Sequence, residues 1–301
     1  SRFGREPGNE HFINLTHIAL NAGYINGVAK KHGEVSQAMF PNHPGVDYIT
    51  NGVHTGTWVM PEMAKVFEKY VAGWALQPEN LIALQDQRIN PDLRRDLWAA
   101  HMAAKKGLMA QICKRRPDCG FDANTFTVGF ARRAATYKRS DLILSKAEWL
   151  LKAALEHGAI QIVFAGKAHP RDDGGKSILQ RIYQKAKEWS GNVPVRVVFI
   201  EDYDMNWGLW LTSGCDVWLN NPVPPLEASG TSGMKAALNG VPQLSTADGW
   251  WMEGSYADRT GWTFGQVPVS AALPTEFRYE DDAVNLFYYL PEIARMFYQA
   301  T

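Results

Sequence analysis

A change of hydrophobic period near residue 125 constrains the fold of this chain more than any other feature of its sequence. Beyond that point, short runs rich in β-branched and aromatic residues alternate with stretches of helical spacing. The runs lie at 126–131, 160–165, 195–200 and 216–219, and the helical stretches at 140–157, 175–190 and 204–213. Because strands that alternate with helices at this spacing form parallel sheets, we predict an α/β, Rossmann-like sheet with helices on both faces.

The sequence on either side of this alternation has mostly helical periodicity. Residues 11–39 carry apolar side chains at near-helical spacing, interrupted by glycines, and 61–116 returns to a helical pattern. Residues 47–50 are expected to form a short strand, and 282–300 a last amphipathic helix. We therefore expect a helical N-terminal portion that leads into the parallel sheet.

Composition excludes several classes of protein. The chain has 301 residues, of which 46% are hydrophobic and 21% charged, as in ordinary soluble globular proteins. Its 31 basic residues balance 31 acidic ones, so neither a nucleic-acid surface nor a membrane-binding surface is expected. We find no apolar run of transmembrane length and no secretory signal. The chain also starts without a methionine, so we expect it to be processed or part of something longer.

The cysteines point to a reducing compartment. Cys113, Cys119 and Cys215 are three in number and have neither a disulfide framework nor zinc-ligand spacing. We therefore expect no metal site, and a cytoplasmic location is the simplest inference.

The stretch from Glu227 to Gly240, EASGTSGMKAALNG, is the clearest candidate for a binding site. Gly230 and Gly233 allow a tight turn that feeds a short helix at 234–238, and the N–H groups at such a helix start form an anion site. Lys235 would then stand in the first helical turn, where a positive charge is unfavourable. This placement indicates either a bound anion or covalent use of the amine, against the alternative of an ordinary loop with a surface lysine.

A second candidate follows the first predicted strand. Four cations occur there, namely Arg132, Arg133, Lys138 and Arg139. Ligands of parallel sheets bind outside the carboxyl ends of the strands, so this loop should lie beside the turn at Gly230. Guanidinium groups grip phosphate in a bidentate manner, which favours a phosphate clamp over a solvated basic patch.

These stretches resemble a known family. EASGTSGMKAALNG, with its continuation GVPQLSTADGWWMEG up to Gly254, is similar to the pyridoxal phosphate segment of the glycogen and α-glucan phosphorylases, and most to their short bacterial and archaeal members. The resemblance implies that Lys235 binds pyridoxal 5'-phosphate covalently. It also implies further cofactor contacts, from Arg132, Tyr203, Gly230, Thr231 and Ser232. A packed tyrosine is the alternative for Tyr203, and Lys167 is either structural or near the cofactor.

The resemblance also assigns substrate residues. Arg133 and Lys138 match the family's ligands of the reacting phosphate. His32, in the segment NGVAKKHGE, matches a histidine at the glucosyl site, and Asn51, in YITNGVH, matches an asparagine that contacts the same sugar. The remaining matches to sugar-hydroxyl ligands are Glu227, Ser229 and Gly230.

The implied activity is phosphorolysis, in which an α-1,4-glucan and orthophosphate give glucose 1-phosphate and the cofactor's phosphate relays a proton. The family has two lobes of the GT-B type. We expect residues 56–301 to form the C-terminal, cofactor-binding lobe and residues 1–55 a remnant of the other. Because the family's glycine loop over the phosphate has no counterpart here, the chain alone is expected to be inactive.

Two alternatives keep part of this interpretation. A sugar-nucleotide glucosyltransferase resembling glycogen synthase would share the fold and need no covalent use of Lys235. A non-catalytic fragment would bind glucan or a partner, such as the missing lobe or a second copy of the chain.

Overall fold

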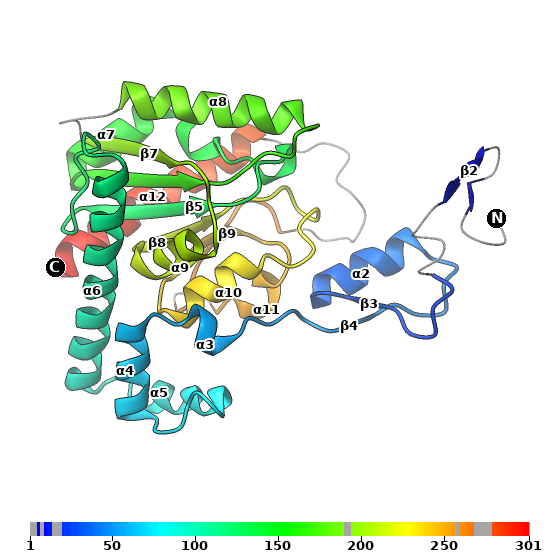
Figure 1. Ribbon diagram of the computed structural model, residues 1–301, viewed down its shortest axis with the longest axis horizontal. Coiled ribbons are helices and arrows are strands. Elements are labelled where there is room, and N and C mark those ends of the chain that lie inside the picture. The colour runs from blue at the N-terminus through cyan, green and yellow to red at the C-terminus, as the bar shows by residue number, and fades with distance from the viewer. Residues whose placement is uncertain are drawn as a thin grey trace.

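The computed structural model describes residues 5–6, 9–13, 20–189, 194–256, 259–267 and 279–300, and its centre is a parallel sheet of six strands (Figure 1). The strands are β5 (Phe126–Ala131), β6 (Ile160–Ala165), β7 (Val195–Ile200), β8 (Val217–Asn220), β9 (Gln243–Thr246) and β10 (Gly261–Phe264). The α/β prediction is confirmed, with the first three strands at the predicted bounds and the fourth displaced by one residue. The sequence analysis missed β9 and β10, which are short and contain the polar residues Gln243, Ser245 and Thr263.

The strand order reverses between β5 and β8. Across the sheet the order is β10-β9-β8-β5-β6-β7, and every neighbouring pair is parallel. The chain therefore builds β5, β6 and β7 in one direction, returns to place β8 beside β5, and continues the other way. This is the doubly wound order, whose ligands bind at the carboxyl ends of the strands where the direction changes.

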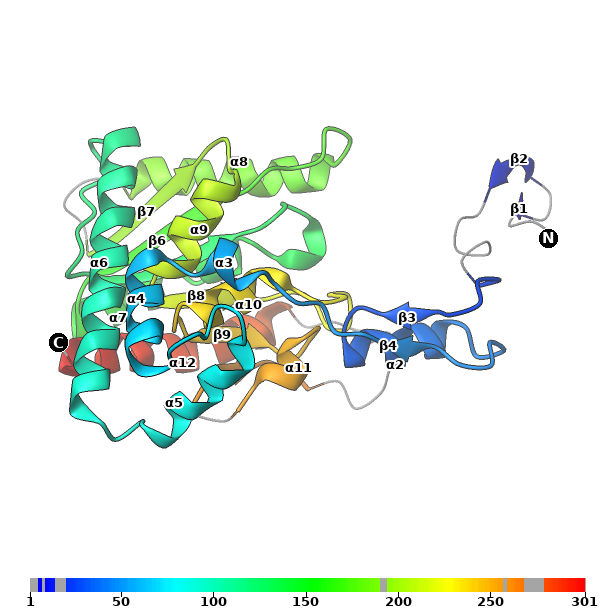
Figure 2. The same cartoon turned by 60° about the horizontal axis from the view of Figure 1, so that its bottom comes forward.

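Helices cover both faces of the sheet (Figures 1 and 2). The helices on one face are α7 (Ala147–His157), α8 (Asp173–Glu188) and α12 (Tyr279–Ala300), and those on the other are α6 (Pro91–Arg115), α9 (Met205–Gly214) and α10 (Thr231–Leu238). Within β5, Phe130 packs on the first face and Ala131 on the second, and both are buried. Burial on both faces explains why these strands are continuous apolar runs rather than alternating ones.

The helical pattern predicted over 11–39, with interruptions at its glycines, is wrong for the described residues before Lys30. Only α2 (Lys30–Met39) is helical; before it, β2 (Asn9–Ile13) pairs with β1 (Arg5–Glu6), and residues 14–19 lie outside the described residues. The short strands β3 (Asn26–Gly27) and β4 (Asp47–Tyr48) pair in parallel, which confirms part of the strand expected at 47–50. The backbone at Gly27 packs directly on Gly33, since a Cβ on Gly27 would lie 2.5 Å from the backbone nitrogen of Gly33. This close approach replaces a helix through Gly27.

Residues 20–54 form an N-terminal arm that extends from the body of the protein (Figures 1 and 2). The carboxylate of Glu253, in α11 (Trp251–Gly254), binds the arm. Glu253 accepts hydrogen bonds from the backbone N–H of Lys30 (3.0 Å) and from the hydroxyl of Thr50 (2.6 Å). Two separate segments of the arm are therefore attached to the two oxygens of one side chain.

The helical pattern predicted over 61–116 is confirmed as a series of shorter helices. After α3 (Thr55–Trp58) come α4 (Pro61–Tyr70), the 3-10 helix η1 (Pro78–Ile82), α5 (Ala83–Asp86) and then α6. Apolar side chains of α4 and α6, including Met63, Phe67 and Leu93, form a third buried cluster beside the sheet. Leu238 of α10 packs against this cluster, which joins α4 to α10.

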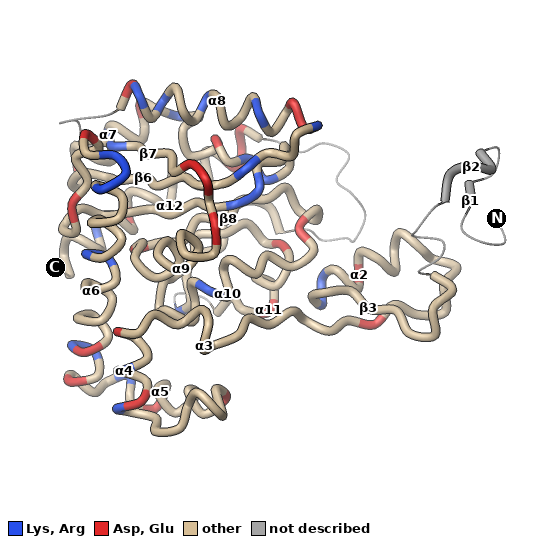
Figure 3. Tube along the Cα trace, viewed as in Figure 1, with Lys and Arg blue, Asp and Glu red and all other residues tan. Residues whose placement is uncertain are grey.

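The distribution of charged residues and the apolarity of the helices agree with the expectations from the composition. Basic and acidic residues are interspersed over the described elements (Figure 3). Within the described residues, no helix combines the length and the apolarity that crossing a membrane requires.

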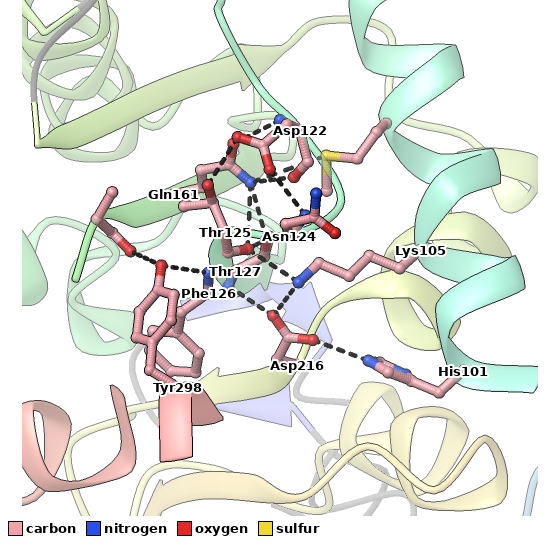
Figure 4. A network of polar contacts seen from close by, with 12 residues as sticks. His101, Lys105, Asp122, Asn124, Thr125, Phe126, Thr127, Gln161, Asp216 and Tyr298 are labelled. Carbon is pink, nitrogen blue, oxygen red and sulfur yellow. Dashed lines mark hydrogen bonds and ion pairs between the residues drawn. The ribbon is translucent and has the colours of Figure 1, made fainter. Parts of the chain in front are cut away.

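A buried polar network fixes α6 to the amino-terminal ends of β5 and β8 (Figure 4). Lys105, which is 0% exposed, donates to Asp216 Oδ2 at 2.6 Å and to the carbonyl of Thr125 at 2.8 Å. Asp216 also accepts from the N–H of Thr127 and lies 2.8 Å from His101 Nε2. Since each charge has a partner, the network tolerates burial that neither ion would tolerate alone.

We expect Lys105→Met to lower the free energy of unfolding by about 3–5 kcal/mol, because it leaves the Asp216 carboxylate buried without its cation. The neighbouring Lys106 is exposed on the same helix, so Lys106→Met should change stability by less than about 0.5 kcal/mol. Urea unfolding of both variants measures the difference. Equal effects would show that the buried pair contributes no more than a surface lysine does.

Candidate functional site

The loops after β5 and β8 meet at the point where the strand order reverses. Arg132 directly follows β5 and donates to the side chain of Asn220, the last residue of β8. Arg132 Nη2 also lies 2.7 Å from Glu227 Oε1, and Lys138 Nζ lies 2.8 Å from Glu227 Oε2. Glu227 therefore bridges two cations, and these three buried residues are called the Glu227 cluster below.

The charges of the cluster are set by burial and by one another. Burial lowers the pKa of Lys138 to about 8, and Arg132 contributes in the same direction, although Glu227 opposes it. Burial alone would raise the pKa of Glu227, but the attraction of Arg132 and Lys138 outweighs it and holds that pKa below its usual value. At neutral pH the cluster thus combines two cations with one carboxylate and has a net positive charge.

The four-cation clamp predicted for this loop is only partly correct. Arg133 is exposed beside Tyr137, at the edge of the Glu227 cluster. Arg139 instead points into the protein, where it pairs with Asp282 at 2.7 Å and donates to the carbonyls of Asn221 and Pro222. Arg139 therefore holds the loop after β8 against α12, and a bound anion would have to compete with those contacts.

Asp248 belongs to the site although the sequence analysis did not select it. It is 1% exposed, and its two oxygens accept hydrogen bonds from the N–H groups of Glu227 (2.8 Å) and Gly249 (2.9 Å). Burial raises the pKa of Asp248 to about 7, although both N–H groups act in the opposite direction. The dipeptide Asp248-Gly249 is a turn signal in the sequence, but β9, which ends two residues before Asp248, was not predicted.

The loop of Asp248 is packed closely on the loop of Glu227. Gly249 has a φ of 55°, and a Cβ there would lie 2.4 Å from the carbonyl oxygen of Ser229. Trp250 N–H donates to that same carbonyl at 2.8 Å. The backbone from Glu227 to Ser229 is therefore fixed at both ends by residues 248–250.

The start of α10 is open to an anion. Gly230 precedes the helix with a left-handed φ of 89° and offers no side chain to cap it. Thr231 and Ser232 form the first turn, and Ser232 Oγ accepts from Trp218 Nε1 at 3.3 Å. Ser229 Oγ is buried and has no hydrogen-bond partner among the described residues. These groups can serve a ligand at the helix N-terminus.

Lys235 stands elsewhere on α10 than the sequence analysis predicted. The helix begins at Thr231 rather than 234, so Lys235 is its fifth residue and not in its first turn. The argument from an unfavourable helix dipole is therefore wrong. Its half-buried ammonium lies 3.5 Å from the centroid of the Trp58 ring, and burial lowers the pKa of the amine. A lowered pKa makes the amine a better nucleophile.

Trp58 was also missed, because nothing in its sequence context distinguishes it from a core tryptophan. Asn239 fixes its backbone by donating to the Trp58 carbonyl at 2.6 Å and accepting from Met60 N–H at 2.8 Å. The same amide donates to the carbonyl of Lys235 at 2.9 Å. Asn239, expected only to end the helix, thus holds the tryptophan over the lysine.

Tyr203 lies on the same side as Trp58. A Cβ on Gly208 would be 3.0 Å from the Tyr203 hydroxyl and 3.2 Å from the Trp58 ring, so both rings pack against α9 at a residue without a side chain. Burial raises the pKa of Tyr203, which keeps its hydroxyl protonated. Aromatic rings, an amine and an open helix N-terminus are thus brought together around α9 and α10.

The arm carries the two remaining predicted residues. His32 Nδ1 accepts from the N–H of Val28 at 3.0 Å, and burial lowers the pKa of the ring, so the neutral form carries its proton on Nε2. This bond lies within the arm, and no hydrogen bond between described residues joins His32 to the Glu227 cluster. Asn51 lines a cavity of about 610 Å³ together with Met234 and Trp250.

Two further candidate loops make contacts through their backbone. The carbonyl of Lys167 accepts from Ala134 N–H at 2.9 Å, which links the loops after β5 and β6, while its side chain is exposed. The glycines at 174–175 open α8, where Asp172 accepts from Gly175 N–H at 2.8 Å. The helical stretch predicted over 175–190 is confirmed by α8.

Comparison with known proteins gives consistent matches. A family model described as carbohydrate phosphorylase matches residues 6–265. A glycogen phosphorylase of Aquifex aeolicus is 42% identical over 294 residues, which are 88% of this chain and 41% of that protein. A maltodextrin phosphorylase of Thermococcus litoralis is 39% identical over 285 residues, 87% of this chain and 33% of that protein. A glycogen phosphorylase of Mycobacterium tuberculosis is 36% identical over 315 residues, 95% of this chain and 35% of that protein. The chain therefore spans less than half the length of each of these three relatives.

We expect Asp248 to make stability fall as the pH rises. Its folded pKa of about 7 lies above the value of about 3.9 for a free aspartate. Its contribution to stability is therefore complete below about pH 4 and lost as the pH rises through about 7. Asp248→Asn stays neutral, so its unfolding free energy relative to the unmodified chain should increase between about pH 5 and about pH 8.

The measurement is urea unfolding at both pH values. Asp86→Asn, at an exposed site, is the matched control and should show no such change. A parallel response of the two variants would contradict the raised pKa of Asp248.

Proposed function

This chain belongs to the carbohydrate phosphorylase family, and we propose that it carries the cofactor- and phosphate-binding lobe of an α-glucan phosphorylase. The proposed reaction transfers a glucosyl unit from an α-1,4-glucan to orthophosphate and yields glucose 1-phosphate. Residues 56–301 would form this lobe, and residues 1–55 would belong to the other. The observation that carries the proposal is the packing of Lys235 against Trp58, close to the open N-terminus of α10.

Pyridoxal 5'-phosphate fits these residues. Lys235 supplies an amine of lowered pKa, and Trp58 and Tyr203 supply flat apolar surfaces for a ring. Gly230 lies five residues before Lys235, about 7 Å along the helix axis, so a phosphate group at the helix start matches the length of such a cofactor. Thr231, Ser232 and Arg132 would complete the phosphate contacts. When bound, the cofactor supplies a phosphate group that exchanges a proton with the substrate phosphate.

The Glu227 cluster would hold the substrate phosphate by exchange of partners. Without a bound anion, Glu227 pairs with both Arg132 and Lys138, and the cluster keeps a net positive charge. An incoming phosphate would replace Glu227 as the partner of Lys138 and would also bind the exposed Arg133. Glu227 would then be free to bind the hydroxyl groups of the sugar. Because these cations are already fixed by the fold, they would hold the phosphate without reorganising during the reaction.

The sugar would be bound by groups from both sides of the site. Ser229 offers a buried hydroxyl that has no partner among the described residues, and Gly230 offers its backbone. From the arm, the Nε2 proton of His32 and the amide of Asn51 would be the donors. Since only these two residues represent the first lobe, we also propose that the chain alone does not turn over glucan at a useful rate.

The cofactor proposal is tested by covalent labelling. We expect borohydride treatment of the chain with pyridoxal phosphate to fix one adduct on Lys235. Trypsin then fails to cleave there, so the peptide 197–235 is replaced by 197–259 carrying the adduct mass. Lys235→Arg should abolish the adduct, and the control Lys167→Arg should keep it. An adduct that survives in Lys235→Arg would contradict the assignment of Lys235. No adduct in the unmodified chain would also contradict the proposal, and it would favour a relative that has the fold without the cofactor.

The phosphate proposal is tested by the pH dependence of sulfate binding. Sulfate keeps its charge in this range, whereas Lys138, with a pKa of about 8, loses its own as the pH rises. We expect affinity to fall at or above about pH 8, because a bound anion raises the pKa of its cation further. Lys138→Met should bind more weakly and lose this dependence, while Lys152→Met, at an exposed position, should keep it. Calorimetric titration decides, and an unchanged profile in Lys138→Met would contradict the assignment.

A further inference from the structure

Two of the three thiols lie against each other at the end of α6. Cys113 is in the last turns of the helix and Cys119 follows it by six residues, and their sulfur atoms are 3.9 Å apart. The backbone brings them together, because Arg116 N–H donates to Ile112 and Cys119 N–H donates to Arg116. The spacing alone did not indicate a disulfide, since the contact depends on this reversal of the chain.

We propose that Cys113 and Cys119 form a redox modification site that a peroxide closes to an intramolecular disulfide. The site lies apart from Lys235 and the Glu227 cluster, so it does not depend on the proposed function. In a reducing compartment such a disulfide would be transient, which is typical of redox-sensing thiols rather than of structural crosslinks.

The difference in burial between the two thiols determines which of them reacts first with the peroxide. Cys113 is partly exposed, whereas Cys119 is 5% exposed and burial raises its pKa to about 11. Cys113 is therefore the thiol that a peroxide can reach, and Cys119 is the one that resolves the product. Cys113 also lies close to the end of α6, where a helix has the freedom to let the sulfurs approach to the bonding distance of about 2.05 Å.

The chemistry balances with a peroxide as the oxidant. The thiolate of Cys113 attacks one peroxide oxygen, the O–O bond breaks, and a sulfenic acid and one water form. The sulfur of Cys119 then attacks the sulfenic sulfur, the S–S bond forms, the S–O bond breaks, and the proton of Cys119 leaves in a second water. Two thiols and one hydrogen peroxide thus give one disulfide and two waters.

The closed loop would contain the cations that contact the segment before Tyr203. Arg116 pairs with Glu201, and Arg115 lies 3.2 Å from Asp202. Arg115 also lies over the ring of Trp207 in α9, 6.0 Å from its centroid. A disulfide on either side of Arg115 and Arg116 would restrict both, and through them the loop that follows β7.

Peptide mapping of the peroxide-treated chain tests the crosslink. Trypsin cleaves after Lys114 and Arg115 but not between Arg116 and Pro117, so a disulfide must join peptides 107–114 and 116–132. We expect this linked pair in non-reduced digests and its loss on reduction. We expect its formation to quicken as the pH rises, because resolution needs the thiolate of Cys119. Cys215, which is fully buried, lies in a separate peptide and should remain reduced.

Three cysteine variants test the roles assigned to Cys113 and Cys119. Cys119→Ser should leave a sulfenic acid on Cys113 that a dimedone-type reagent traps, Cys113→Ser should give no linked peptide, and Cys215→Ser should behave like the unmodified chain. Oxidation of Cys113 to the sulfinic acid without a link, a link between two chains, or no reaction would each overturn the proposal. Slower hydrogen exchange at residues 201–205 in the oxidised chain is expected. Unchanged exchange with the link present would overturn the connection to Tyr203 alone.

Discussion

The reversal of strand order between β5 and β8 is the constraint on which the site depends. Because β5 and β8 are neighbouring parallel strands, the loops that follow them leave the same edge of the sheet side by side. Residues 88 positions apart, Arg132 and Asn220, come into hydrogen-bond contact for this reason alone. Arg139, which ties the second loop to α12 through Asp282, keeps the two loops together.

The charged groups at this point are arranged so that burial is tolerated. A carboxylate removed from water is costly, and Glu227 tolerates it because each of its oxygens meets a cation. Asp248, which lies beside it without a cation of its own, has a pKa raised to about 7, so it is fully charged only at higher pH. Lys138 has a pKa low enough that small changes in its surroundings alter its charge. A site with such a lysine changes its charge on binding an anion more readily than a site in which every charged group is fully paired.

The sequence analysis predicted the features that depend on the local hydrophobic pattern and on the long segment shared with the family. The four apolar strands β5 to β8 were found at nearly their observed bounds, and the candidate residues around Glu227 and Lys235 do gather at the carboxyl ends of the strands. Features set by contacts between distant segments were not predicted. Gly27 packs on Gly33 and ends the expected helix, and the start of α10 moved Lys235 out of the first turn. Trp58 and Asp248 acquire their places from Asn239 and Glu227, 181 and 21 residues away.

The attachment of the arm at Glu253 has a mechanical consequence. Lys30 and Thr50 are held by the two oxygens of one carboxylate, and they lie two residues before His32 and one before Asn51. A single side chain attached in this way acts as a pivot: it resists sliding of the arm more than it resists tilting. Because both hydrogen bonds end on the same side chain, a movement of Glu253 would displace the segments of His32 and Asn51 together rather than one at a time.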